Sequence, residues 1–464
     1  MTGHLSIDWP SLPALRCCVG VRRPGRIVAF GLALAGCGVL YGQSSQPPNQ
    51  QRNQGKLAFV IPNLYGPDGL RLDNPDHDAH FDSSFQENFG PFNSAVASQL
   101  TSLPIPSPAS GFTYTFDRTL GIYERTAQTF GPILTERAET LGKDRFYFGF
   151  TFQHFSFDDI DGISLNSFPT VFTHSDTVDP DSPFLQDVVT TDNLLDIQIG
   201  QFTSFFSYGL TDRVDLSVAI PLVSSTLDVV SAATVRPIGT ANAPDDAVRL
   251  AHTFGQGRDV RSQTFSSGSS ATGLGDIIVR LKGHTNRWER SGLAFAADIR
   301  LPTGDELNFL GTGAPGFKPF AIFSYNYDKI SPHVNVGYQF NGESILGGDV
   351  RTGQTGDLPD QFLYSAGVDL GVSSKFSFAA DFLGQRNIDA QRVSLGEAIS
   401  AAGVPTSFNT LHFSRDSVNT ADAAFGFKIN PASTLLVTFN VIVKLNDGGL
   451  RSRVTPLVGL SFTP

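Results

Sequence analysis

The chain has almost no cysteine. Cys17, Cys18 and Cys37 are its three cysteines, and none of the residues that follow up to position 464 is a cysteine. Beyond that leading stretch, a disulfide framework, a thiolate metal site and a cysteine nucleophile are therefore excluded.

Charge and long apolar runs are also scarce. Charged residues make up 17% of the chain and the net charge is −11. Nothing would therefore neutralise the phosphates of a nucleic acid, and we expect no nucleic-acid partner. After residue 45 no apolar run approaches the roughly 18–20 residues of a spanning helix. If the chain crosses a membrane, it must do so as a closed β-barrel, the other structure that pairs every backbone polar group in lipid.

Glycine and phenylalanine are abundant instead, with 46 and 39 copies, which suits many short strands joined by Gly-rich turns. Residues 274–301 show the pattern most clearly, because apolar and polar side chains alternate there with period two. The apolar positions of the second run are Leu293, Phe295, Ala297, Ile299 and Leu301. The positions between them include Asp298 and Arg300, so the opposite face of the strand is charged at its middle. A soluble sandwich would place that face in water, whereas a transmembrane barrel would place it in the lumen.

The same alternation persists from about residue 145 to the end, and it predicts an all-β protein of about 12 strands, with 14 as the alternative. One run, at 195–199, loses its phase near Phe202, which predicts a β-bulge there. The other alternating runs lie at 146–152, 214–220, 320–322, 334–340, 362–370, 376–382, 423–429, 435–443 and 454–462.

The links between these runs alternate between short and long, as in an antiparallel up-and-down barrel with short periplasmic turns and long external loops. An even strand count then brings both ends of the barrel to the periplasm. The chain also carries Phe462 almost at its end, as outer-membrane barrels commonly do, and this strand is what the barrel-assembly machinery would recognise. The short links are 209–212, 328–331, 373–375 and 430–433, and the long ones are 156–193, 222–273, 341–360 and 385–417.

Residues 1–140 differ from the rest of the chain in their sequence pattern. Residues 1–43 read as an export signal, with arginines ahead of an apolar run. Ordinary cleavage near Gly42 competes with lipidation of Cys37, which ends a lipobox-like Leu-Ala-Gly-Cys sequence. Residues 44–56 form a polar linker. Residues 57–140 contain a predicted helix near 91–101 and a hairpin, and we expect them to form a plug inside the barrel or a cap over it, leaving 141–464 as the barrel itself.

Three stretches carry a family resemblance: GLGDIIVRLKG, DIRLPTGDELNFLGTG and YGLTDRVDLSVAIP. They resemble outer-membrane barrel proteins grouped with the meta-cleavage pathway of phenol degradation, which are more distantly similar to long-chain fatty-acid transporters. The resemblance covers about residues 140–464. It implies passage of small, often hydrophobic compounds across the bacterial outer membrane, and it supplies no catalytic residues.

Charged residues on the polar face of the strands are the candidate lumen lining. Such rings of charge set the preference of a pore for ions and solutes. The plainer reading is that they pair with one another and fill a narrow interior, as Asp276 and Arg300 would. Their mixed signs argue against strong selection for anions or for cations. The candidates are Asp196, Arg213, Asp215, Asp276, Arg280, Lys282, Asp298, Arg300, Asp369, Asp381, Lys428 and Lys444.

The other sequence motifs give little evidence for metal binding or catalysis. The run 158–162 resembles half of a calcium loop but lacks the distant glutamate, so we read it as a solvated loop and expect no metal and no cofactor. No cluster of serine, histidine and aspartate suggests catalysis. We therefore expect an outer-membrane channel for small organic solutes, in contact with outer-membrane lipid and not an enzyme. An outer-membrane barrel enzyme acting on envelope lipid and a secreted β-sandwich binding protein stay open as alternatives.

Overall fold

The computed structural model describes residues 55–66, 69–74, 81–82, 90–104, 114–117, 122–125, 129–174, 183–255, 257–287, 290–399, 407–432 and 434–463. The described residues belong to one compact unit. The predicted export signal, its cleavage and the lipidation of Cys37 lie outside the described residues, as does most of the predicted linker.

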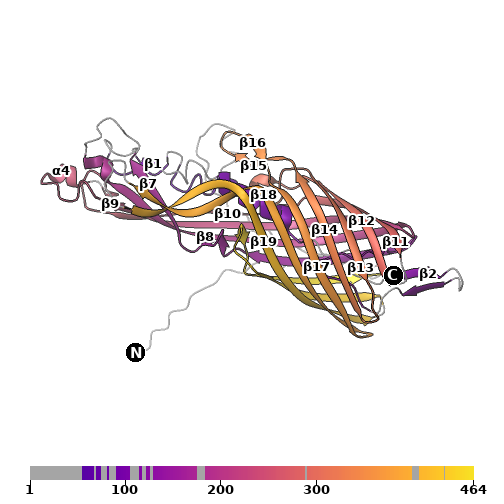
Figure 1. The fold of residues 1–464 in the computed structure, drawn as a ribbon. Helices are drawn as coiled ribbons and strands as arrows, with labels where there is room; N and C mark the ends of the chain where they lie inside the picture. Colours follow the sequence, from indigo (N-terminus) through magenta and orange to yellow (C-terminus); the bar gives the residue numbers. More distant parts are fainter. Residues whose placement is uncertain are drawn as a thin grey trace, which may run out of the picture. The chain divides into compact units, whose positions relative to one another are not determined.

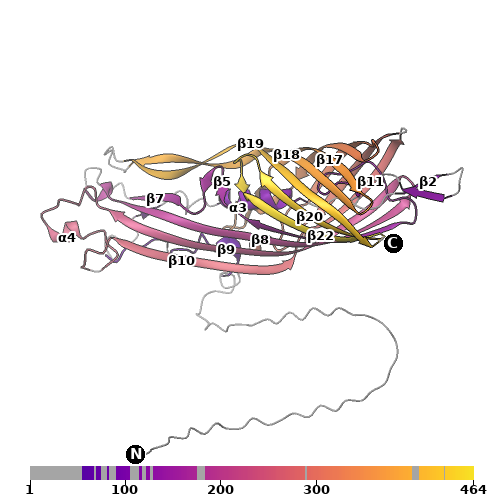
Figure 2. The same cartoon turned by 90° about the horizontal axis from the view of Figure 1, so that it is seen from below.

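Among the described residues, twelve antiparallel strands close into a barrel (Figures 1 and 2). Each strand pairs with the next along the chain, and the last closes on the first, with Leu460 opposite Phe150. The predicted all-β, up-and-down barrel of about twelve strands is therefore confirmed. The strands are β4 (Phe146–Ser156), β8 (Val188–Thr211), β9 (Val214–Arg236), β11 (Ile277–Arg287), β12 (Ser291–Leu301), β13 (Gly316–Tyr325), β14 (Ile330–Asn341), β17 (Asp360–Ser373), β18 (Phe376–Ile399), β19 (Ser407–Ala432), β20 (Leu435–Lys444) and β22 (Val454–Phe462).

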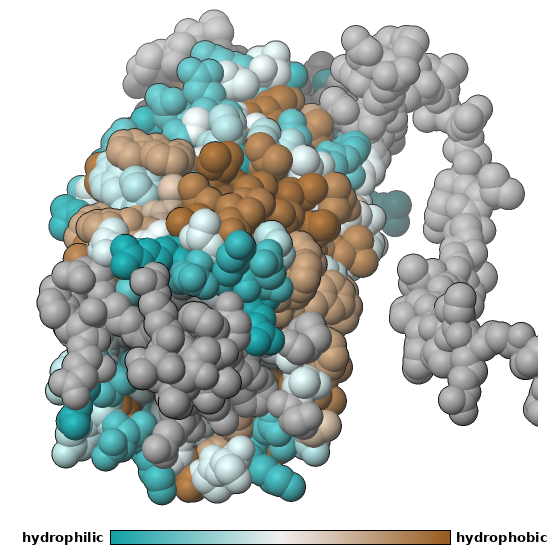
Figure 3. Space-filling view, turned by 90° about the vertical axis from the view of Figure 1, so that its right-hand side faces the viewer, coloured by the Kyte–Doolittle hydropathy of each residue, from teal (hydrophilic) through white to brown (hydrophobic). Residues whose placement is uncertain are grey.

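Apolar and polar side chains alternate along each strand and so form the outer and inner faces of the barrel wall. On β12, Phe295 and Ile299 are exposed, while Ala296, Asp298 and Arg300 are buried inside. The same division runs around the barrel, so that apolar side chains gather on its outer wall (Figure 3). An apolar outer face and a polar inner face are what a barrel in a lipid bilayer requires, because lipid offers no hydrogen-bonding partner.

Strand β8 contradicts two predictions, the β-bulge near Phe202 and the full extent of the long loops. Its 24 residues pair with β4 and β9 without a bulge near Phe202. The apolar positions change phase in the sequence because the environment changes: Leu195 and Ile197 point inward into a dry core, whereas Phe202 and Phe206 point outward. The strand therefore leaves the lipid-facing barrel and continues as part of a folded extension with its own core. Parts of the expected long loops are strands for the same reason, including all of 222–236 and 385–399.

The extension lies beyond the long-loop rim of the barrel. Its core joins the inner faces of β8, β9, β18 and β19 to buried residues of the amino-terminal segment, such as Leu57 and Phe92. Its smaller elements are η1 (Leu57–Phe59), β1 (Phe81–Asp82), α3 (Gly90–Ser102), β5 (Asp159–Ile160), β6 (Ile163–Ser164), β7 (Phe168–His174), η2 (Pro183–Gln186), α4 (Asp246–Arg249), β10 (Ser262–Leu274), η3 (Glu306–Asn308), β15 (Glu343–Asp349), β16 (Gln354–Asp357) and β21 (Leu450–Arg451).

The amino-terminal segment contributes two further parts. A hairpin, β2 (Tyr114–Asp117) and β3 (Ile122–Arg125), forms a separate two-stranded sheet. Residues 129–142, here called the inner segment, have no regular structure and every one of them is buried. No helix in the described ranges is long and apolar enough to span a membrane.

Candidate functional site

The inner segment crosses the barrel interior near the rim that carries the short turns. Its backbone N–H groups donate to inward-facing side chains on β18, β14 and β13: Leu134 to Asp381 (3.2 Å), Glu136 to Asn335 (2.7 Å) and Ala138 to Ser324 (2.8 Å). Leu141 donates to the carboxylate of Asp215 at 2.9 Å. A chain without secondary structure can be buried only if such partners satisfy its polar groups, so these inward side chains explain why it lies there.

Charged side chains of the barrel wall also hold the inner segment in place. Arg280 on β11 bonds Asp298 on β12 through two nitrogens, at 2.6 and 2.8 Å, and bonds Glu136 of the inner segment through the third. Lys428 donates to three successive backbone carbonyls, those of residues 130–132, and Lys282 donates to the carbonyl of Glu139 at 2.7 Å. Buried cations are costly unless they are paired in this way. The segment therefore compensates charges that the wall alone would leave exposed to the lumen.

The structure places the twelve predicted lumen residues in three groups. Nine are buried on the inner face, and Lys444 lies at the long-loop rim, bonded to Asp159 and 2.9 Å from Asp447. Two were assigned wrongly. Asp196 is exposed on the outer face of β8, because the exchange of apolar faces on that strand reverses its parity, and Arg213 is exposed in the turn between β8 and β9. The nine are Asp215, Asp276, Arg280, Lys282, Asp298, Arg300, Asp369, Asp381 and Lys428.

Helix α3 ends inside the barrel mouth, where glutamines hold it. Gln361 donates to the hydroxyls of Thr101 and Ser102 at 2.5 and 3.1 Å, and Gln385 donates to Ser102 at 2.9 Å. Gln339 is 3.5 Å from the Thr101 carbonyl. Sequence reasoning missed these glutamines because it followed charge, although their place on the polar face of β14, β17 and β18 was a usable signal. The contacts at this end are neutral, unlike those of the inner segment.

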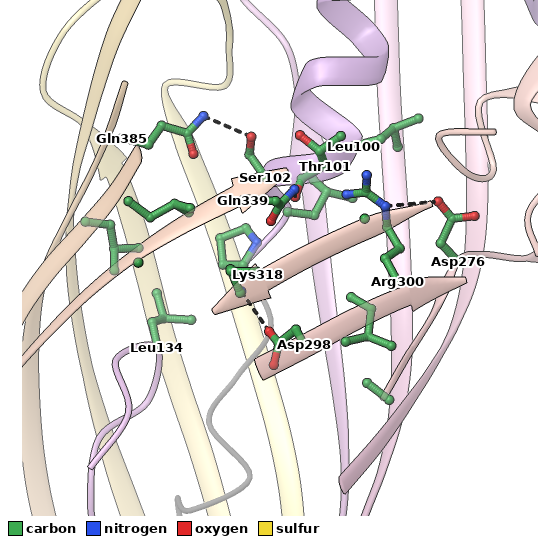
Figure 4. A pocket seen from close by; sticks show the side chains of 18 of the residues that line it. Leu100, Thr101, Ser102, Leu134, Asp276, Asp298, Arg300, Lys318, Gln339 and Gln385 are labelled. Carbon is green, nitrogen blue, oxygen red and sulfur yellow. Dashed lines mark hydrogen bonds and ion pairs between the residues drawn. The ribbon is translucent and has the colours of Figure 1, made fainter. Parts of the chain in front are cut away.

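A chamber of about 220 Å³ lies between the end of α3 and the inner segment (Figure 4). Its wall combines apolar side chains with amides and with charged groups, among them Asp298, Arg300 and Lys318. Lys318 is bonded to Asp298 at 2.9 Å and also lies over the ring of Phe320. The apolar lining includes Leu100, Leu103, Leu134, Ile278, Leu310, Phe320, Val336, Leu363 and Leu383.

Two of the three stretches that carry the family resemblance, GLGDIIVRLKG and DIRLPTGDELNFLGTG, meet beside this chamber. Asp276, which ends the GLGD run, accepts hydrogen bonds from the backbone of Gly304 (3.1 Å) and from the backbone and hydroxyl of Thr312 (2.8 and 2.7 Å). Gly311 approaches so closely that a Cβ on it would lie 2.2 Å from the Asp276 carboxylate. Asp276 therefore fixes the loop between β12 and β13 against the chamber wall.

The prediction that the acidic run 158–162 is a solvated loop is wrong, because Asp159 and Ile160 are buried and the Asp161 side chain is 3% exposed. Asp161 accepts from Arg392 (3.0 Å) and from the backbone of Val393 and Gly449 (both 2.8 Å). Asp159 is bonded to Lys444. These carboxylates are thus occupied by protein donors, and no group of three or more histidine, cysteine or acidic residues that could hold a metal ion occurs in the part of the chain that the structure describes.

These features define a class of protein. The closed wall has an apolar exterior, and the interior is polar and filled by a segment of the same chain; such a molecule is a transmembrane β-barrel of the bacterial outer membrane. The chain belongs to the family described as "Putative MetA-pathway of phenol degradation", whose model matches residues 187–449. The resemblance that the sequence motifs indicated is therefore confirmed.

Solved structures of similar barrels include outer-membrane channels and transporters. An outer membrane channel from Pseudomonas putida F1 is 13% identical, covers 70% of this chain and 98% of its own, and has a TM-score of 0.43. The P. putida toluene transporter TodX is 10% identical, covers 69% and 89%, and has a TM-score of 0.30. A Pseudomonas aeruginosa FadL homologue is 10% identical, covers 69% and 90%, and also scores 0.30. No curated protein matches the sequence. Identities and scores this low say nothing about the solute.

Proposed function

We propose that this protein is an outer-membrane channel that admits small organic solutes through the chamber, with residues 57–140 acting as its plug. The observation that carries the proposal is the chamber itself, which lies inside the barrel between the end of α3 and the inner segment. A solute that enters from outside must pass α3, and one that leaves toward the periplasm must pass the inner segment.

The chamber's size and lining suit a small solute with an apolar body. An apolar cavity of roughly 150 Å³ holds benzene, and this chamber of about 220 Å³ leaves room for a polar substituent. Amides such as Gln339 and Gln385 line it together with leucines, so that both parts of such a molecule find partners. We propose passive transport rather than catalysis, because Arg280 and Lys318 are both bonded to Asp298 instead of being free to exchange protons with a substrate.

The remaining partners follow from the outer surface. Outer-membrane lipid would contact the apolar wall, where Phe295 and Phe425 are each 53% exposed. The barrel-assembly machinery would recognise β22, which ends with the exposed Phe462.

Conductance in planar bilayers tests the proposal. We expect the full chain to show small, brief openings, because α3 and the inner segment obstruct the lumen. A variant that lacks residues 44–140 should show larger, steady openings. Absence of conductance in both forms, with barrel closure verified by heat-modifiable migration, would contradict a channel and favour a structural or enzymatic barrel.

A further inference from the structure

The charged groups of the chamber are not all compensated to the same degree. Arg280 makes hydrogen bonds to carboxylates through all three of its guanidinium nitrogens, and Lys318 bonds a carboxylate at 2.9 Å. Arg300, in contrast, bonds neutral oxygens: its Nη2 donates to the Asn341 side chain at 2.7 Å and its Nε to the Ala314 carbonyl at 3.4 Å.

The nearest carboxylate to Arg300 is only a weak partner. Asp276 lies 3.9 Å from Nε, beyond hydrogen-bond distance. Its two oxygens already accept three hydrogen bonds from the loop between β12 and β13, through Gly304 and Thr312. The loop therefore stabilises the negative charge of Asp276. Asp276 in turn stabilises the positive charge of Arg300 only weakly.

Arg300 thus presents an unused donor at the chamber wall. Its Nη1 donates to no residue within the described ranges, although the side chain lines the chamber and is 7% exposed. The guanidinium lies against Gly316, where a Cβ would come within 2.9 Å of its central carbon. Glycine at that position therefore leaves room for the guanidinium, which lies beside Asp276 at the chamber wall (Figure 4).

We propose that the chamber binds small organic monocarboxylates, with Arg300 receiving the carboxylate and the apolar lining receiving the hydrocarbon part. A guanidinium is the side chain best matched to a carboxylate, because its planar array of N–H donors gives charge-assisted hydrogen bonds. Leu134, Ile278 and Phe320 supply the apolar lining. The inference rests on the proposed function, whose solute class it narrows.

Binding of benzoate and of benzamide tests the inference, because the two have nearly the same shape and differ in charge. Titration calorimetry of the detergent-solubilised full chain should show benzoate binding about tenfold more tightly than benzamide, the difference between a charge-assisted and a neutral hydrogen bond. R300Q should remove this preference, and R300K should restore part of it. As a matched control, R290Q removes an exposed positive charge outside the chamber and should leave the preference unchanged.

The outcomes separate this inference from the proposed function. Equal affinity for benzoate and benzamide in the unaltered protein, or a preference that survives R300Q, would overturn the carboxylate site while leaving the channel intact. Heat-modifiable migration verifies that each variant has a closed barrel, so that a loss of preference is not a loss of fold. The planar-bilayer test of the full and shortened chains decides the channel independently of either ligand.

Discussion

At the scale of single residues, most charges that point into the barrel stabilise its filling. Lys428 is the clearest case, since its ammonium group donates to the carbonyls of residues 130–132 and the residue is 1% exposed. A charge in that position favours a closed lumen. Solute selection by the inward charged residues stays a prediction. Arg300 is the residue among them for which we propose such a role.

Replacing Lys428 with methionine should loosen the inner segment. The substitution keeps most of the side-chain volume but leaves three buried carbonyls without their donor, at a cost of about 1.5–3 kcal/mol for a charged hydrogen bond. In planar bilayers the fraction of time spent open should rise by about tenfold or more. Lys375→Met, in an exposed turn, is the control and should behave like the unaltered protein. Identical behaviour of the two variants would show that Lys428 does not hold the closed state.

Asp187, in the extension, should make part of the fold sensitive to acid. Burial by itself would raise the pKa of Asp187, but hydrogen bonds from His252 (2.8 Å) and Thr240 (2.6 Å) outweigh it and hold the pKa below its usual value. Because the folded pKa lies below the unfolded value of about 3.9, the ionised form favours folding. This stabilisation is complete above that pH and is lost as the pH falls through the folded pKa.

Hydrogen exchange measures this effect directly, because the N–H groups of Gly239 and Thr240 donate to Asp187. Their protection should be high at neutral pH and should fall below about pH 4. Asp187→Asn should lower protection at neutral pH and flatten its dependence on pH, whereas Asp192→Asn, at an exposed position, should do neither. Protection in Asp187→Asn that matched the unaltered protein at every pH would refute this role.

At the scale of elements, the long strands serve two environments. Phe295 on β12 and Leu395 on β18 are similarly exposed, at 53% and 55%, but the first lies in the barrel and the second in the extension. Phe295→Arg should destabilise folding into lipid vesicles by about 2–4 kcal/mol if the position is near the bilayer midplane. Leu395→Arg should change stability by less than about 0.5 kcal/mol. Urea titration of both variants checks the pair, and equal effects would place the lipid boundary elsewhere.

The sequence predicted the wall well, because alternation alone decides which side chains face lipid. Runs such as 293–301 therefore gave strands, parity and closure into a barrel. It predicted the strand ends poorly, since β8 keeps its alternation beyond the membrane and merely exchanges its apolar face, which misplaced Asp196. The glutamines that hold α3 were missed, because neutral polar residues on an inward face look alike until a partner from a distant part of the chain is known.

At the scale of the whole molecule, the chain forms a barrel and fills it with its own amino-terminal part. The two obstructions differ in chemistry: neutral amides hold the end of α3, whereas charged groups such as Arg280 and Lys428 contribute to holding the inner segment. We infer that the outer obstruction yields more easily, because neutral hydrogen bonds are weaker than charge-assisted ones. Passage would then be limited by displacement of the inner segment.

A disulfide between the inner segment and the wall tests this account most directly. A Cβ on Gly292 would lie 3.1 Å from that of Ala138, slightly closer than the roughly 3.5–4.5 Å between the Cβ atoms of a disulfide, so a small shift of the segment would allow the bond. In a background with Cys17, Cys18 and Cys37 replaced by serine, the pair Ala138→Cys and Gly292→Cys should lose its bilayer openings on oxidation and regain them on reduction, while each single variant should not respond. Openings that persist unchanged in the fully cross-linked protein would contradict the claim that the inner segment must move for a solute to pass.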